Sequence, residues 1–78
     1  MNQLEVLRES LGQCDEIVLD ALLMRNRIVE DIMAYKEAND IPILQPEQEA
    51  KQREWLNRRM EGKRHKDEVM AVFEEITR

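Results

Sequence analysis

Apolar residues recur at alternating spacings of three and four along the first half of the chain, from Asn2 to Ala38. This spacing gathers them in one stripe along a helix that packs over many turns, and the stretch has no proline and a single glycine. The stripe has one charged member, Arg25, and otherwise comprises Leu4, Leu7, Leu11, Cys14, Val18, Ala21, Ile28, Ile32 and Tyr35. We therefore predict one long helix over residues 2–38.

A helix of this length is too long for a compact chain of 78 residues. It would span roughly 55 Å, whereas a compact globule of this size has a radius of gyration of only about 11–12 Å. A helix that extends beyond its own domain must bury its apolar stripe against another chain. The pattern therefore predicts a homodimer built around paired long helices.

Turn-forming residues divide the remainder of the chain into two shorter helices. Asn39-Asp40-Ile41-Pro42 ends the long helix, because Asn and Asp favour turns and the residue before a proline avoids the helical region. Pro46 suits the first position of a second helix, and Gly62 suits a stop after about Glu61. A second helix is therefore predicted from residue 46 to about residue 61.

A third helix is predicted to open at Asp67 and Glu68. Its expected inward face comprises Val69, Val72, Phe73 and Ile76. The apolar register is intact at the end of the chain without a capping residue, so we expect either that the third helix is cut short and the natural chain continues, or that the end of this helix frays. Residues 1–78 are thus predicted to form one all-α domain of three helices, one long and two shorter.

Composition excludes several kinds of site and partner. Cys14 is the only cysteine and His65 the only histidine, so an internal disulfide and a Cys/His zinc site are both excluded. The longest apolar stretch, residues 21–24, is far shorter than the ~20 residues that cross a bilayer, and no secretory signal precedes it. A free thiol without export features predicts a cytoplasmic protein. The net charge of −5 disfavours general binding of nucleic acid.

The basic residues of the long helix are candidates for binding a small anion. Arg25 and Lys36 are eleven positions apart, which places them about 20° from the same face and about 16 Å apart along the axis. Alternatively, Arg25 pairs with a carboxylate of a neighbouring helix and Lys36 is solvated. Arg8 lies about 25 Å from Arg25 and about 100° round the helix, so it reaches that region only from another subunit of an antiparallel or crossed dimer.

The order of these residues resembles the all-helical chorismate mutase family over nearly the whole chain. The resemblance rests on the spacing of Arg8, Arg25 and Lys36 and on five segments, Leu7-Arg8-Glu9, Asp15-Glu16, Leu22-Leu23, Ile41-Pro42-Ile43 and Pro46-Glu47-Gln48-Glu49. It implies an intertwined homodimer of three-helix subunits with two equivalent sites, each completed by the first arginine of the other subunit. Members of the family also occur fused ahead of other aromatic-pathway enzymes, so such a fusion is a further expectation.

The reaction that the resemblance implies is the rearrangement of chorismate to prephenate, on the route to phenylalanine and tyrosine. It is an intramolecular [3,3] shift, for which no cofactor or metal is expected. By resemblance, Arg25 and the partner subunit's Arg8 bind the carboxylates of the substrate. Lys36 donates to the ether oxygen, where negative charge grows, and Glu49 accepts from the substrate hydroxyl.

The chain departs from the family pattern at several positions. Gln45 and Gln48 stand where the family often has an aspartate and an arginine. Gln48 can donate hydrogen bonds but lacks the charge and the fork of arginine, which predicts weaker substrate binding. The family's late serine and glutamine would fall beyond Arg78, and the loss of one such donor commonly costs on the order of a hundredfold in rate, so slow or absent activity is expected.

Two other functions remain open from the sequence. Gln48 and the early end of the third helix are compatible with a non-catalytic helical module for dimerisation or regulation. A lyase that releases pyruvate from isochorismate would use the same scaffold and cations. Glu49 favours the mutase over the lyase, although a carboxylate at a helix start is also favoured by the helix dipole alone.

Overall fold

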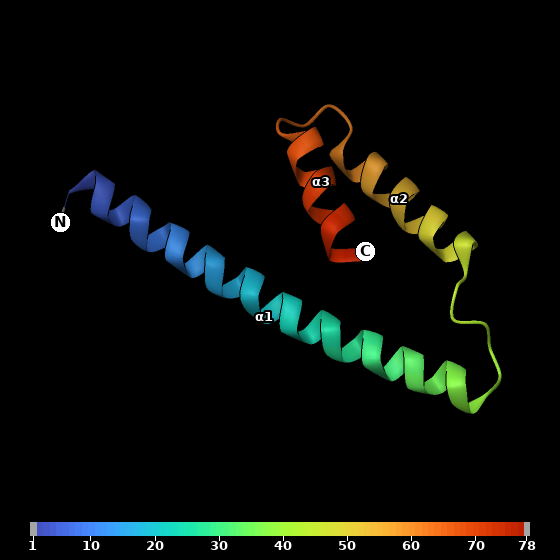
Figure 1. Cartoon of the computed structure of the whole chain (residues 1–78). Helices are drawn as coiled ribbons and strands as arrows, with labels where there is room; N and C mark the ends of the chain where they lie inside the picture. Colours follow the sequence, from blue (N-terminus) through green and yellow to red (C-terminus); the bar gives the residue numbers. More distant parts are fainter. Residues whose placement is uncertain (1, 78) are drawn as a thin grey trace. The chain divides into compact units, whose positions relative to one another are not determined.

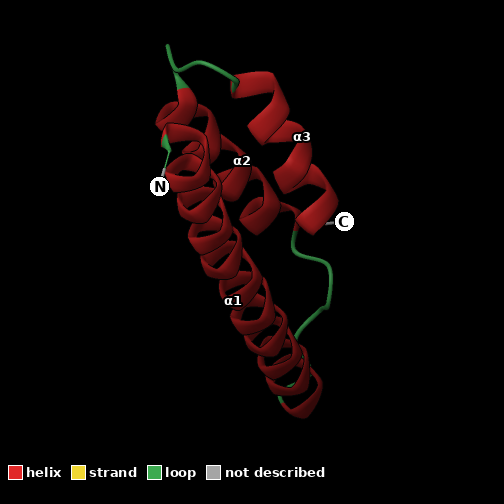
Figure 2. Cartoon of the chain, turned by 90° about the vertical axis from the view of Figure 1, so that its left-hand side faces the viewer, coloured by secondary structure: helices red, strands yellow, loops and turns green. Residues whose placement is uncertain are grey.

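Three helices and their connections make up the computed structural model, which describes residues 2–77. The helices are α1 (Gln3–Ala38), α2 (Pro46–Met60) and α3 (Lys66–Thr77) (Figure 1). Between residues 2 and 77 everything else is loop or turn, as Figure 2 shows. The predicted all-α class, with one long and two shorter helices, is therefore confirmed. By its backbone contacts the chain forms two compact units, an N-terminal unit of residues 1–43 and a C-terminal unit of residues 44–78.

Helix α1 dominates the N-terminal unit and runs for 36 residues without a break. Asn2 caps its start, because the Asn2 side chain accepts a hydrogen bond from the backbone N–H of Glu5 at 2.8 Å. At its other end, the Asn39 side-chain amide donates to the Tyr35 carbonyl at 2.9 Å. The helix predicted over residues 2–38 is confirmed, with Asn2 serving as its cap rather than its first turn.

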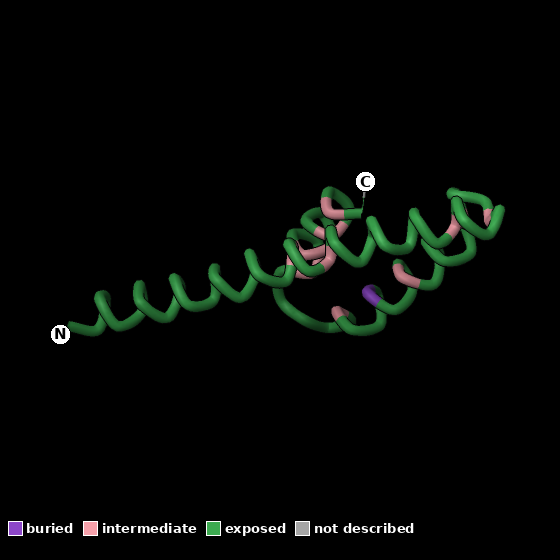
Figure 3. Tube along the Cα trace, turned by 90° about the horizontal axis from the view of Figure 1, so that it is seen from below, coloured by how far each residue is buried: buried purple, intermediate pink, exposed green. Residues whose placement is uncertain are grey.

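The apolar stripe of α1 is exposed along its whole length (Figure 3). The relative exposure of its large apolar members lies between 47% for Ile32 and 64% for Tyr35. Three residues of α1 are half-buried, namely Leu22, Arg25 and Lys36. An uncovered stripe on so long a helix is the surface that the dimer prediction requires, and the dimer itself stays a prediction.

Helices α2 and α3 pack side by side in the C-terminal unit (Figures 1 and 2). Leu56 of α2, at 7% relative exposure, is the buried apolar residue of this pair. The half-buried residues of the two helices are Gln52, Met60, Lys66, Val69, Met70, Phe73 and Ile76. Helix α2 ends one residue earlier than predicted, and Gly62 follows with a φ of 71°, a conformation that glycine adopts without steric cost.

One predicted core position of α3 is wrong. Val72 was expected on the inward face, but it is 57% exposed. Met70 is half-buried in its place, because α3 turns the edge that carries Met70 toward α2. Val72 and Met70 lie about 160° apart around a helix, on either side of Phe73, so a short helix can bury one of them and leave the other in water.

Candidate active site

Arg25 and Lys36 lie on one face of α1. Because the helix is continuous from residue 3 to residue 38, their eleven-residue separation places them about 16 Å apart along the axis and about 20° apart around it. Both side chains are half-buried. Arg8 is exposed on the second turn of the same helix, about 25 Å from Arg25. The predicted placement of these three cations on one helix is therefore confirmed, and Arg8 does not reach the other two along its own α1.

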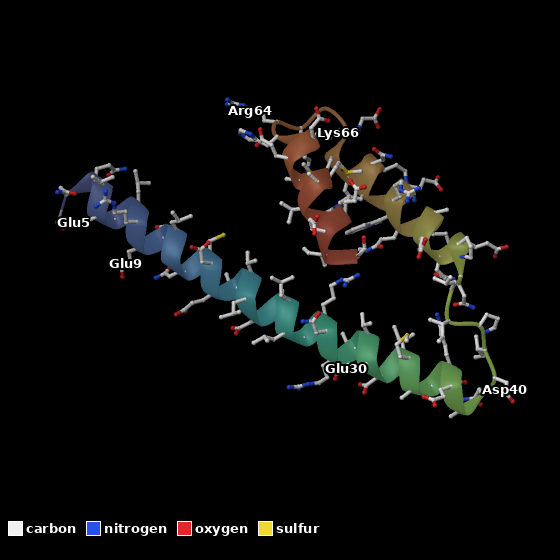
Figure 4. All side chains as sticks on the ribbon, in the orientation of Figure 1. Glu5, Glu9, Glu30, Asp40, Arg64 and Lys66 are labelled. Carbon is white, nitrogen blue, oxygen red and sulfur yellow. The ribbon has the colours of Figure 1, made fainter. Side chains whose placement is uncertain are left out.

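A left-handed residue shapes the end of α1 next to Lys36. Asp40 has a φ of 54°, which reverses the direction of the backbone after the helix. The N–H of Ile41 then donates to the carbonyl of Lys36 at 2.9 Å, the hydrogen bond of a Schellman-type helix end. Figure 4 labels Asp40 at this turn. The linker is thereby directed back past the last turn of α1.

The side chain of Lys36 is held by this linker. Its Nζ donates to the backbone carbonyl of Ile43 at 2.9 Å. The surroundings include three carboxylates, those of Glu30, Glu37 and Asp40, yet within residues 2–77 Lys36 makes no ion pair with any of them. The hydrogen-bond acceptor of the ammonium group is therefore a neutral carbonyl.

An open groove of the N-terminal unit runs beside this contact. Its lining comprises Val29, Glu30, Met33, Ala34, Lys36, Glu37, Asp40, Ile41 and Ile43. Among these residues Lys36 alone is cationic. Lys36 is half-buried in this groove, and its charged end lies at the linker.

Gln48 and Glu49 lie in the first turn of α2, in the C-terminal unit. Both side chains are exposed, and the backbone N–H groups of both residues donate to the carbonyl of Gln45, at 3.0 and 3.4 Å. Glu49 lines a groove between α2 and α3 together with Leu56 and Phe73. Gln48 precedes it by one residue and is turned about 100° away from it around the helix.

The five predicted site residues thus fall into two groups. Arg8, Arg25 and Lys36 share α1, and Gln48 and Glu49 share the first turn of α2. The union of these groups in one binding site stays a prediction. The carbonyl of Ile43 was not anticipated from the sequence, because a backbone acceptor has no side-chain signature. The only available signal was a lysine near the end of a helix followed by Asp40, a residue type that tolerates the left-handed conformation.

Within residues 2–77, no cluster of three or more histidine, cysteine, aspartate or glutamate side chains is arranged to hold a metal ion. In the same part of the chain, none of the helices combines the length and the apolar character that a membrane span requires.

Comparison with protein families gives a match over most of the chain. The family model for chorismate mutase type II matches residues 7–78, which include all five predicted site residues. Among curated proteins and among solved structures, no match was found. Since the match extends over nearly the entire sequence and its all-helical family agrees with the three helices observed, this chain belongs to the chorismate mutase type II family.

Proposed function

We propose that this protein is a chorismate mutase that converts chorismate to prephenate, acting as a homodimer. The family match over residues 7–78 is the observation that carries the proposal. The placement of Arg25 and Lys36 on one face of α1 supports it, because a dicarboxylate ether needs cations held at fixed positions. A cation-lined site also explains how an acidic chain, with a net charge of −5, binds an anionic substrate.

The reaction needs no nucleophile and no proton transfer. Within one molecule, the ether C–O bond breaks while a new C–C bond forms, so atoms and electrons balance without a second reactant. An enzyme accelerates such a step by holding the substrate in its compact reactive conformation. It also stabilises the negative charge that develops on the ether oxygen as the C–O bond lengthens.

Each site residue has a distinct proposed role. Arg25 binds a substrate carboxylate through its guanidinium fork, and the partner subunit's Arg8 binds the other. Lys36 donates to the ether oxygen, and this interaction strengthens in the transition state. Glu49 accepts from the substrate hydroxyl, and Gln48 adds a neutral donor where a cation would bind more strongly.

Dimerisation is part of the proposal, because α1 alone cannot bring Arg8 to the region of Arg25. The uncovered apolar stripe of α1 supplies the surface for pairing. Pairing two such helices in opposite directions places the early turns of one beside the later turns of the other. In that arrangement each site takes Arg8 from one chain and Arg25 and Lys36 from its partner.

The test is an assay of the purified chain with chorismate and, separately, with isochorismate. We expect slow loss of the ultraviolet absorbance of chorismate, with formation of prephenate. Pyruvate released from isochorismate, without prephenate from chorismate, would assign the chain to the lyase reaction instead. If a folded dimer turns over neither substrate and its Tm is unchanged by chorismate, the protein is a non-catalytic module.

A further inference from the structure

The linker after α1 is attached to Lys36 at two points. The backbone N–H of Ile41 donates to the Lys36 carbonyl, and the Lys36 ammonium donates to the Ile43 carbonyl, each at 2.9 Å. The left-handed φ of 54° at Asp40 makes this possible, because it turns the linker back along the helix. The main chain of Lys36 therefore fixes where the linker runs, and the linker in turn fixes the end of the Lys36 side chain.

We propose that the backbone carbonyl of Ile43 is a positioning group for Lys36 in the rearrangement, an inference that rests on the proposed mutase function. A free lysine side chain samples many rotamers, and ordering it only in the transition state would raise the barrier. The hydrogen bond to Ile43 orders it beforehand. An ammonium group has three N–H donors, so one bond to a carbonyl leaves two for the substrate.

The nature of the acceptor supports positioning rather than neutralisation. A carboxylate partner would cancel the charge that the developing oxyanion needs, and three carboxylates line the same groove. Lys36 is nevertheless bonded to a neutral carbonyl. The half-buried Ile41 packs into the groove beside it and keeps the linker in place. Ile43 acts through Lys36 and has no contact with the substrate in this proposal.

The experiment weakens this one acceptor without changing a side chain. Replacing Leu44 by its α-hydroxy analogue converts the amide bond after Ile43 into an ester, whose carbonyl is a poorer acceptor. The length of 78 residues allows the protein to be made by chemical synthesis. The matched control replaces Ile43 by its α-hydroxy analogue, which weakens the Pro42 carbonyl, a group that accepts no hydrogen bond within residues 2–77.

We expect the Leu44 ester to lower kcat by about three- to tenfold with little change in KM, because the interaction of Lys36 grows in the transition state. The control ester should keep the kcat of the parent protein. Equal effects of the two esters, or none from the Leu44 ester, would overturn the proposal. So would a rise in kcat, which would mean that the carbonyl competes with the substrate for Lys36.

A second measurement separates this inference from the proposed function. In protein labelled with ¹⁵N at lysine, the Lys36 ammonium signal should shift in the Leu44 ester and not in the control, whether or not the protein is active. If the Leu44 ester shifts the Lys36 signal but the parent protein has no activity, the mutase function is refuted, and the positioning role with it. If the parent protein is active but the Lys36 signal is the same in the parent, the Leu44 ester and the control ester, the positioning role alone is refuted.

Discussion

Arg25 and Arg27 form a matched pair for testing the binding of the substrate carboxylates. They are two residues apart on α1, so their side chains point about 160° apart around the helix, and only Arg25 shares the face of Lys36. We expect Arg25→Ala to lower kcat/KM by about tenfold or more, the cost of a lost hydrogen bond between charged groups. Arg27→Ala should change it by no more than about twofold.

Steady-state kinetics with chorismate, together with circular dichroism to check helicity, measures this difference. Equal losses in the two variants would indicate a general effect of charge on an acidic protein. In that case Arg25 would not be the residue that binds the carboxylate.

Gln48 offers the opposite experiment, in which a substitution should improve binding. It lies exposed in the first turn of α2 and has neither charge nor a bidentate fork. Gln48→Arg should lower KM for chorismate by about three- to tenfold, and Gln48→Lys should lower it less, because a point charge lacks the geometry of the guanidinium. Initial-rate kinetics with chorismate measures KM for both variants and for the parent protein. An unchanged KM in both variants would place Gln48 outside the site.

At the level of elements, the turn at Asp40 is the most specific feature that joins the sequence to the site. A non-glycine residue in the left-handed conformation carries a cost of roughly 1–2 kcal/mol, which Asp bears better than most residues. Asp40→Gly should therefore raise the free energy of unfolding by up to about 1 kcal/mol, and Asp40→Val should lower it by about 1 kcal/mol or more.

Urea denaturation at fixed protein concentration measures both values. Asp31→Gly is the matched control, because residue 31 lies inside α1, where glycine destabilises a helix by a few tenths of a kcal/mol relative to aspartate. Replacement of aspartate by glycine should therefore raise the free energy of unfolding at position 40 and lower it at position 31. Destabilisation by Asp40→Gly would show that the left-handed turn is not the conformation that residue 40 adopts in solution.

The elements were predictable where a single residue decides the local backbone. Pro46 and Gly62 gave the limits of α2 to within one residue, and the alternating spacing gave α1. The inward edge of α3 was not predictable, since apolar residues on both edges of a helix of 12 residues fit the same pattern, and packing against α2 selects Met70 over Val72. The contact between Lys36 and Ile43 depends on the φ of Asp40, which composition and spacing do not specify.

For the whole molecule, the central prediction is that two chains share each site. An inactive Arg8→Ala protein and an inactive Lys36→Ala protein should regain activity when mixed under conditions that allow subunit exchange. A mixed dimer has one site in which both residues are intact, so an equal mixture should reach about a quarter of the parent activity. The control is Lys36→Ala mixed with Arg25→Ala, each lacking a residue of the same helix face.

Activity regained in the control to the same extent would contradict the proposed division of residues between subunits. In the control, both substitutions affect Arg25 and Lys36, which a single chain supplies together to the same site. Every mixed dimer then has two damaged sites, and the mixture should stay inactive.

The small extent of burial within residues 2–77 has a consequence for how the protein acquires its structure. Leu56 is the one apolar side chain buried within residues 2–77, and a single leucine removes too little surface from water to order α2 and α3. If that order comes from association, refolding from denaturant is a second-order process. Its rate then rises in proportion to protein concentration, and dilution alone melts the helices.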